Sequence, residues 1–167
     1  RGVGEVARQT KACGGYLNAS TIYDHTRYYA VVPATAFEAA LEIQADAYAN
    51  SALDAGELAR ELEVIIEEAR RKADSPEAVT TETLFELMHD RHRIRRWRIG
   101  RAEGLRALRR EDLERFYRTY YQPSNTVLGI VGDVPVSEMV RAVERLYGGL
   151  DDHPIPRDQG PAEVSRS

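Results

Sequence analysis

The stretch YLNASTIYDHTRYYAVV, residues 16–32, decides which fold this sequence can adopt. Both halves are rich in β-branched and aromatic residues, which favour strands, and Asp24-His25 between them is typical of a turn. Gly14-Gly15 precedes the stretch and Pro33 follows it, so both ends carry residues that interrupt regular structure. The sequence therefore predicts a hairpin whose strands cover residues 16–23 and 26–32.

Helical patterns precede and follow the hairpin. Apolar residues recur there at steps of three and four, as they do on the buried face of an amphipathic helix. The helices are predicted over residues 3–12, 37–50, 54–73, 81–89, 110–121 and 136–146. The compact apolar run at 126–131 predicts one more strand. Together these patterns indicate an α+β fold in which helices pack on one face of a sheet.

Composition restricts the function. The chain has 167 residues, of which 43% are hydrophobic and 30% charged, as in ordinary folded domains. Its formal net charge of -4 argues against a general nucleic-acid binder. No apolar run approaches the roughly 20 residues of a membrane span. The single cysteine, Cys13, excludes an internal disulfide framework and a four-cysteine zinc site.

The predicted helix at 54–73 contains the best candidate site. Asp54, with Glu57 three residues later, is typical of a helix start. At about 100° per residue, one face of this helix is apolar: Leu58, Leu62, Ile65, Ile66 and Ala69. Glu61 and Glu68 lie two turns apart on the border of that face. They are either boundary residues paired with arginines, or a metal ligand, Glu68, supported by Glu61, because a buried carboxylate needs such a partner.

Five short motifs follow one another along the chain. Residues 14–29 contain Gly-Gly-x-x-Asn-Ala-x-Thr followed by Thr-x-Tyr, and the acidic pair Glu61 and Glu68 comes next. The others are Asp74-Ser75-Pro76, the loop from His92 to Gly100, and Phe-Tyr-x-x-Tyr-Tyr-x-Pro-x-Asn with Ile-Val-Gly-Asp at 116–133. In this order and spacing they resemble the insulinase/pitrilysin family of metallopeptidases, which includes mitochondrial and bacterial processing peptidases.

The resemblance implies a zinc site. In this family an inverted motif, His-x-x-Glu-His, supplies two zinc ligands and a general base. A glutamate from a later helix is the third ligand, which corresponds to Glu68 here, and Glu61 corresponds to the acidic residue that supports the site. The chain contains no such motif, and His89 and His92 are interpreted as loop histidines. We therefore expect the chain to start downstream of the zinc-binding histidines, with an incomplete zinc site; natural loss of the motif is the alternative.

The resemblance also implies a substrate site and a partner. Asn18, Ala19, Ser20 and Thr21 correspond to an edge strand that pairs with an extended peptide; the alternative is a plain polar edge. A homologous second half, on the same polypeptide or as a partner subunit, is expected, and a homodimer stays open. In the loop at 92–98, Arg-Ile replaces the family's Pro-Tyr, and four arginines surround one Trp. We interpret this loop as solvated or partner-facing rather than as a nucleic-acid site.

Residues 1–150 are thus expected to form a partial metallopeptidase domain, and residues 151–167 a linker or tail. The predicted function is a part of a zinc-dependent endopeptidase that hydrolyses peptides or unfolded protein segments, inactive by itself. The alternative is a non-catalytic scaffold or substrate-presenting subunit with an active partner. Retention of both Glu61 and Glu68 favours the peptidase. An excess of arginine over lysine hints at a bacterial source, in which cytoplasm and periplasm stay open.

Overall fold

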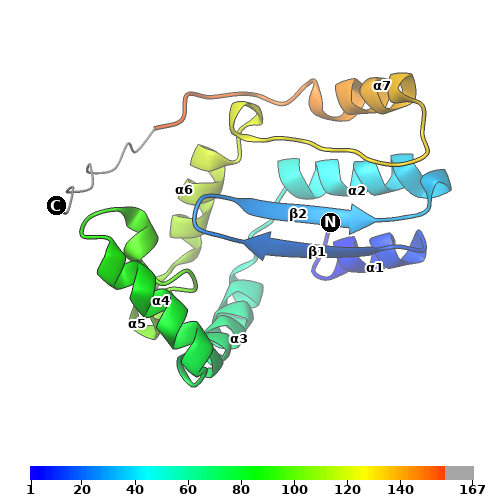
Figure 1. The fold of residues 1–167 in the computed structure, drawn as a ribbon. Coiled ribbons are helices and arrows are strands. Elements are labelled where there is room, and N and C mark those ends of the chain that lie inside the picture. The colour runs from blue at the N-terminus through cyan, green and yellow to red at the C-terminus, as the bar shows by residue number, and fades with distance from the viewer. Residues whose placement is uncertain (157–167) are drawn as a thin grey trace. The chain divides into compact units, whose positions relative to one another are not determined.

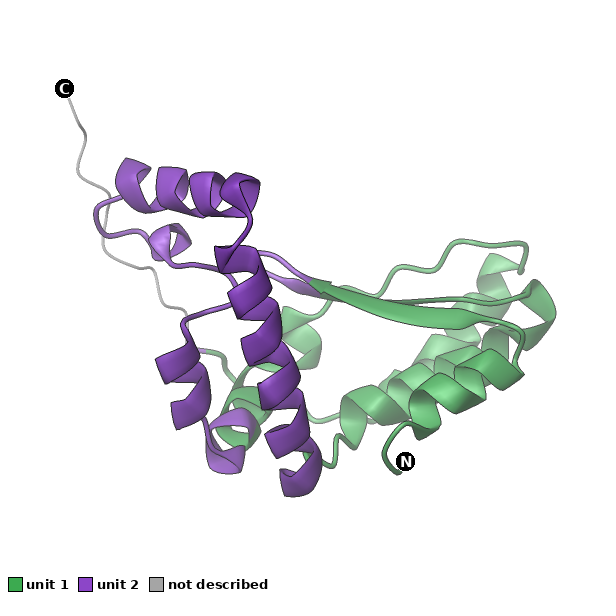
Figure 2. Ribbon diagram, turned by 90° about the horizontal axis from the view of Figure 1, so that it is seen from below, with its two compact units in different colours: residues 1–20, 27–53, 114–155 green, residues 21–26, 54–113, 156–167 purple. Residues whose placement is uncertain are grey.

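The computed structural model of the chain describes residues 1–156, which divide into two compact units. Unit 1 consists of residues 1–20, 27–53 and 114–155, and unit 2 contains residues 21–26 and 54–113 (Figure 2). Within the described residues, no helix has the length and apolar character to cross a membrane.

Unit 1 is built on one central helix, α2. Its elements are α1 (Glu5–Ala12), β1 (Tyr16–Thr21), β2 (Thr26–Val31), α2 (Phe37–Ala49), most of α6 (Arg110–Tyr120) and α7 (Val136–Tyr147), with short 3-10 turns at Ala34–Ala36 and Pro123–Asn125. Helix α2 contacts both α1 and α7 (Figure 1). Its buried residues are Ala40, Leu41, Ile43 and Ala45, and Ala142 of α7 and Thr10 of α1 are buried as well. These small and aliphatic side chains let helices pack closely, so α2 forms the core of this unit.

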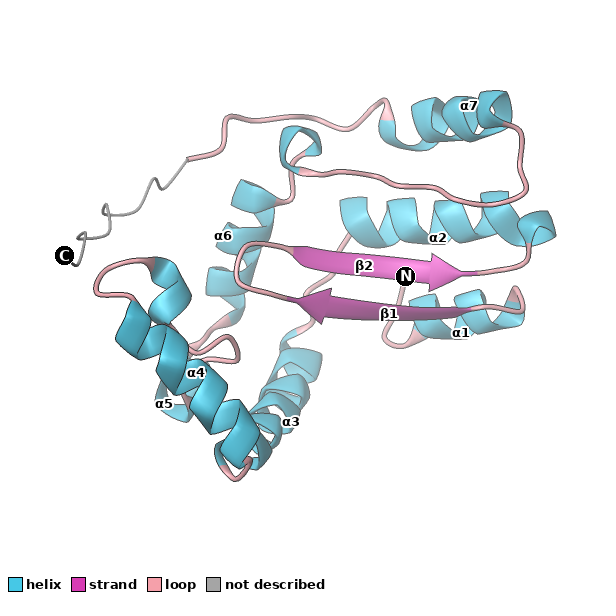
Figure 3. Cartoon of the chain, viewed as in Figure 1, coloured by secondary structure: helices cyan, strands magenta, loops and turns pink. Residues whose placement is uncertain are grey.

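The hairpin has a defined register. The N–H of Ile22 donates to the carbonyl of His25 at 3.0 Å, and the hydroxyls of Thr21 and Thr26 lie 3.1 Å apart. Thr21 and Thr26 are therefore a non-hydrogen-bonded pair of the two-stranded sheet that Figure 3 draws in magenta. In such an antiparallel sheet, hydrogen-bonded and non-hydrogen-bonded pairs alternate. It follows that Leu17, Ala19 and Thr21 direct their N–H and C=O groups away from β2, towards the outer edge of β1.

The glycine pair before β1 has a steric reason. Gly14 has a φ of 77°, in the left-handed region that favours glycine. Gly15 passes so close to Val31 of β2 that a Cβ atom there would collide with the Val31 carbonyl oxygen. Gly14 thus allows the turn before β1, and Gly15 allows the close approach of the backbone to Val31.

Unit 2 consists of helices joined by tight turns. They are α3 (Ala55–Ala73), α4 (Pro76–Met88), a 3-10 turn at Arg93–Arg95 and α5 (Ala102–Ala107). The Asp54 carboxylate accepts from the N–H groups of Gly56 and Glu57, both at 2.9 Å, and so caps α3. Helix α3 contacts α4 and α5, and its Ile66 is 1% exposed.

The α+β class, the hairpin and the long capped helix are confirmed, while three local predictions are wrong. Helix α4 begins at Pro76 instead of residue 81, because Ser75 caps it and proline suits the first helical turn. Helix α5 was not expected. Residues 126–131 are not a strand: the described sheet contains β1 and β2 alone, and Val127 and Val131 are fully exposed. An apolar run becomes a strand only where another strand pairs with its backbone.

Candidate functional site

The two candidate acids lie on α3, as the helical periodicity predicts. All the residues expected on the apolar face are buried or half-buried, and Glu63 and Glu67 on the opposite face are exposed. Glu61 is exposed, and the Glu68 side chain is 47% exposed and forms an ion pair with Lys72 at 3.1 Å. Between these two acids lies Val64, an apolar residue that is 57% exposed. Both carboxylates therefore lie at the boundary between the apolar and exposed faces of α3, and neither is buried in the core.

Glu68 alone does not make a zinc site. A catalytic zinc ion takes three protein ligands and a water molecule. Among residues 1–156, no group of three or more histidine, cysteine, aspartate or glutamate side chains could hold a metal ion. Glu68 fits as one carboxylate donor, since its side chain is accessible and its partner is a solvent-exposed lysine. The described residues do not complete the metal site, so no chemical step through zinc is derived for this chain.

The predicted substrate strand is fully accessible. Asn18, Ala19, Ser20 and Thr21 are all exposed. The Asn18 Oδ1 accepts from the N–H of Ala19 at 2.8 Å, so the backbone donor at the outer edge of β1 is held by a side chain and not by a strand. Residues 18–20 belong to unit 1, whereas Thr21, Glu61 and Glu68 belong to unit 2. Most of the strand edge and the acid pair therefore belong to different units.

The loop at 92–98 is held by contacts that the sequence did not reveal. Glu82 of α4 is 7% exposed, and its carboxylate accepts from the backbone N–H of Arg98 at 3.4 Å and from its Nε at 3.1 Å. The Trp97 Nε1 donates to Glu86 at 3.1 Å. Gly100, with a φ of 81°, closes the loop by donating to the Trp97 carbonyl at 3.0 Å. A buried carboxylate 16 residues before its arginine has no periodic signal, so sequence reasoning missed Glu82.

The same loop reaches the tip of the hairpin. Arg93 forms an ion pair with Asp24 at 2.6 Å. The Tyr23 ring lies 5.2 Å from the Phe85 ring and 5.3 Å from the guanidinium of Arg98. All of these residues belong to unit 2. The hairpin turn and the basic loop therefore form one connected surface.

The two paired histidines are ordered but are not a metal site by themselves. The rings of His89 and His92 lie 5.6 Å apart, and His92 Nδ1 accepts from the N–H of Ile94 at 3.2 Å. This bond makes His92 the cap of the 3-10 turn that follows it. A structural role accounts for His92, as the interpretation of a loop histidine predicts.

Unit 1 contains a cluster of tyrosines that joins the hairpin to helices α2, α6 and α7. We call it the tyrosine cluster, and its members are Tyr28, Tyr48, Tyr117, Tyr121 and Tyr147. The hydroxyls of Tyr28 and Tyr121 lie 2.5 Å apart. Burial, and then the hydrogen bond to Tyr28, raise the pKa of Tyr121 above its usual range, and burial raises the pKa of Tyr147. Tyr121 and Tyr147 are therefore neutral structural groups at neutral pH.

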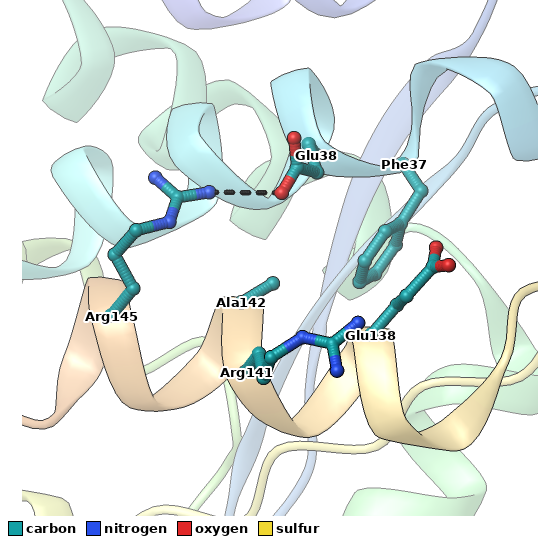
Figure 4. Close-up of a pocket in the computed structure, with 6 residues that line it drawn as sticks. All are labelled: Phe37, Glu38, Glu138, Arg141, Ala142 and Arg145. Carbon is teal, nitrogen blue, oxygen red and sulfur yellow. Dashed lines mark hydrogen bonds and ion pairs between the residues drawn. The ribbon is translucent and has the colours of Figure 1, made fainter.

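An open groove of about 480 Å³ lies between α2 and α7 (Figure 4). Arg145 of α7 crosses it, with ion pairs to Glu38 at 3.1 Å and Glu42 at 3.2 Å. Phe37 forms its apolar wall. None of the predicted site residues lines this groove, and its charged groups bind across from one helix to the other, so it is a packing seam between α2 and α7.

The chain thus combines an α+β fold, an accessible strand edge and a pair of accessible glutamates on a capped helix. Comparisons with known proteins identify its family. The family model described as "Insulinase (Peptidase family M16)" matches residues 2–98, and the one described as "Peptidase M16 inactive domain" matches residues 107–166. The chain belongs to the insulinase family of peptidases, family M16.

Relatives and solved structures support this assignment. The chain is 31% identical to an uncharacterized zinc protease of Mycobacterium leprae over 86% of its length, and 29% identical to a probable mitochondrial-processing peptidase subunit beta of Arabidopsis thaliana over 95%. The crystal structure of a protease from Helicobacter pylori has a TM-score of 0.88 at 28% identity, with 94% of the chain covered. The insulinase-like α+β fold is thus confirmed.

The match is partial in the other direction. The chain covers 32% and 30% of the two relatives and 39% of the Helicobacter pylori chain. It therefore corresponds to about a third of the length of such proteins. The activity of a whole peptidase is not carried over by similarity alone.

Proposed function

We propose that this chain is part of a zinc-dependent endopeptidase that hydrolyses peptides or unfolded protein segments, with β1 as the strand that holds the substrate. The observation that carries the proposal is the open outer edge of β1 in a chain of a peptidase family. Ala19 directs its N–H to that edge, where the Asn18 side chain accepts it. An extended peptide would replace this contact with a backbone hydrogen bond.

Binding through a strand edge suits a peptidase of broad specificity. Backbone N–H and C=O groups occur in every peptide, so hydrogen bonds to Leu17, Ala19 and Thr21 place a substrate without selecting its sequence. The exposed Tyr16 of β1, 58% accessible, offers an apolar contact beside the edge. In this proposal Asn18 fixes the position of the edge donor before substrate arrives.

The acid pair has a different role. Glu68 contributes one zinc ligand. Glu61, two helical turns away on the same border of α3, supports that site by accepting hydrogen bonds from other ligands. Zinc supplies an activated water when it is bound in a complete site. Because the described residues offer a single ligand, the chain is expected to have no peptidase activity by itself. It then needs histidine ligands and a second half from elsewhere in the protein or from a partner subunit.

The edge is tested with a matched pair of proline variants. Ala19→Pro removes the donor at the outer edge of β1, and Ala30→Pro removes a donor at the opposite edge, that of β2, while neither position donates to the other strand of the hairpin. Fluorescence anisotropy with a rhodamine-labelled, uncharged extended peptide measures binding to each variant of this chain. We expect Ala19→Pro to weaken binding about ten-fold or more and Ala30→Pro to leave it unchanged. Equal binding by Ala19→Pro and the original chain would contradict the proposal.

One observation favours the alternative role. Residues 107–166 match the model described as an inactive domain, so a non-catalytic scaffold or substrate-presenting subunit with the same strand edge is the second candidate. The residues encoded directly upstream in the parent gene discriminate between the two: a His-x-x-Glu-His motif there supports the peptidase, and its absence supports the scaffold.

A further inference from the structure

We propose that the arginine loop, defined here as residues 91–101, is a binding surface for carboxylates of a polypeptide. This inference goes beyond the proposed function of β1. It starts from an uneven charge distribution. Residues 91–110 hold nine of the chain's 23 basic residues and one of its 27 acidic residues, although the net charge is -4.

Five of the six arginines of this loop fall into two sets. Arg93, Arg98 and Arg101 are used within the structure, in ion pairs with Asp24, Glu82 and Glu86. Arg95 and Arg96 are exposed, and neither forms an ion pair or hydrogen bond through its side chain within the described part of the chain. Two adjacent guanidinium groups are thus presented on a backbone fixed by the first set.

Hydrogen bonds within the loop and to helix α4 hold the loop in one conformation before a ligand binds. Glu82, buried in α4, holds Arg98 through backbone and side chain. His92 caps the turn that leads to Arg95, and the backbone N–H of Arg96 bonds to the Arg93 carbonyl. A fixed loop loses little conformational freedom when a ligand binds, so charge contacts contribute more to affinity there than on a mobile segment.

The loop is also held by the hairpin turn, which belongs to the same unit. Arg93 is ion-paired with Asp24 in that turn, and Arg98 lies over the Tyr23 ring beside it. The arginine loop and the hairpin turn therefore form one surface of unit 2.

The chemistry favours a polypeptide over a nucleic acid. Arginine binds carboxylates through two parallel hydrogen bonds. Single-stranded nucleic acid needs free aromatic faces on which bases stack. The one tryptophan here is engaged, since its Nε1 donates to Glu86 and the Arg101 guanidinium lies 5.9 Å from its ring. The acidic charge of the remaining chain also repels a long polyanion.

The test uses this chain and three labelled peptides with the same uncharged extended core: one flanked by Glu, one by Lys and one by Gln. We expect the Glu-flanked peptide to bind about ten-fold tighter than the Gln-flanked one at low salt, with the advantage reduced by salt. The double variant Arg95→Glu/Arg96→Glu removes that advantage and leaves the Gln-flanked peptide unaffected. Arg118→Glu, at an exposed arginine of α6, is the matched control and keeps the advantage.

Each outcome points to one proposal. Retention of the Glu preference by the Arg95→Glu/Arg96→Glu variant overturns the arginine-loop inference. A single-stranded oligonucleotide that competes better than a Glu peptide of equal charge overturns it as well. If Ala19→Pro binds the Gln-flanked peptide as well as the original chain does, the strand edge fails instead, whatever the Glu-flanked peptide does. The two failures are therefore distinguishable.

Discussion

The two units of this chain are stabilised by different interactions. Unit 1 buries a set of apolar side chains, most of them on α2, and also contains the tyrosine cluster. In unit 2, among the described residues, Ile66 is the one buried apolar side chain, and the other buried residue is the carboxylate Glu82. The candidate zinc ligand and the arginine loop both belong to unit 2. The comparison teaches that the charged residues proposed to bind zinc or carboxylates lie in the unit with the smaller apolar core, whereas residues 18–20 of the strand edge belong to unit 1.

The largest effect is expected from deleting the buried side chain of unit 2. Ile66→Ala removes three carbons from a site that is 1% exposed, and such a change costs about 2–5 kcal/mol of unfolding free energy. Hydrogen exchange measured by mass spectrometry should show loss of protection in α3 and α4, with α2 protected as before. Leu41→Ala, in the core of unit 1, is the matched control and should show the reverse pattern. If each variant lowers hydrogen-exchange protection equally in both units, the units unfold together and do not differ in what stabilises them.

A smaller loss is expected at the buried carboxylate of unit 2. Glu82→Gln keeps the shape of the side chain but removes the charge that holds Arg98, which should cost about 1–3 kcal/mol. Trp97, the one tryptophan of the chain, lies in the same loop and reports the change through its fluorescence emission. Glu63→Gln on the exposed face of α3 is the control and should change neither quantity. Unchanged emission and stability in Glu82→Gln would show that the arginine loop is fixed by other contacts.

A pH-dependent effect should distinguish unit 1. Burial and the bond to Tyr28 raise the pKa of Tyr121 above its ordinary 10.0, so the folded state keeps a proton that the unfolded chain releases. The stabilisation is fully present below about pH 10 and is lost as pH rises above it. Tyr121→Phe should cost about 1 kcal/mol near neutral pH, through loss of one hydrogen bond, and should decline less steeply above about pH 10. Urea unfolding followed by circular dichroism from about pH 8 to about pH 11 measures both slopes.

The control for that experiment is the exposed Tyr16, which is 58% accessible. Tyr16→Phe should leave the pH dependence as it is in the original chain. A decline above pH 10 that is equally steep in Tyr121→Phe would assign the alkaline loss to other groups, and the tyrosine cluster would not distinguish unit 1 from unit 2.

Local patterns in the sequence were sufficient for the parts of the fold that depend on neighbours in the chain. The cap of Asp54, the apolar face of α3 and the hairpin strands all depend on residues a few positions apart, so their periodicity predicted them. Residues 126–131 failed for the opposite reason. Their composition favours a strand, but a strand depends on a pairing partner, and none occurs for them in the described residues.

The candidate site divides in the same way. Periodicity placed Glu61 and Glu68 at the border of α3, and the structure agrees, while their catalytic roles rest on the family resemblance and stay predictions. Glu82 and the contact of Arg93 with Asp24 were missed, because they join residues 16 and 69 positions apart. Such long-range pairs have no spacing that a sequence pattern could indicate. The structure was needed to show that the arginine loop and the hairpin turn form one surface.

The smallest effect on stability is expected at the residue with the most specific proposed role. Glu68 pairs with Lys72 on the surface of α3, with side chains 47% and 44% exposed, and such helical pairs contribute about 0.5 kcal/mol or less. Urea unfolding of Glu68→Gln should therefore differ little from the original chain, and Lys72→Gln, its matched control, should behave alike. A loss of about 2 kcal/mol or more in Glu68→Gln alone would make the carboxylate a structural group. If Glu68 contributes little to stability, its carboxylate can exchange the surface ion pair with Lys72 for a metal ion without unfolding the unit.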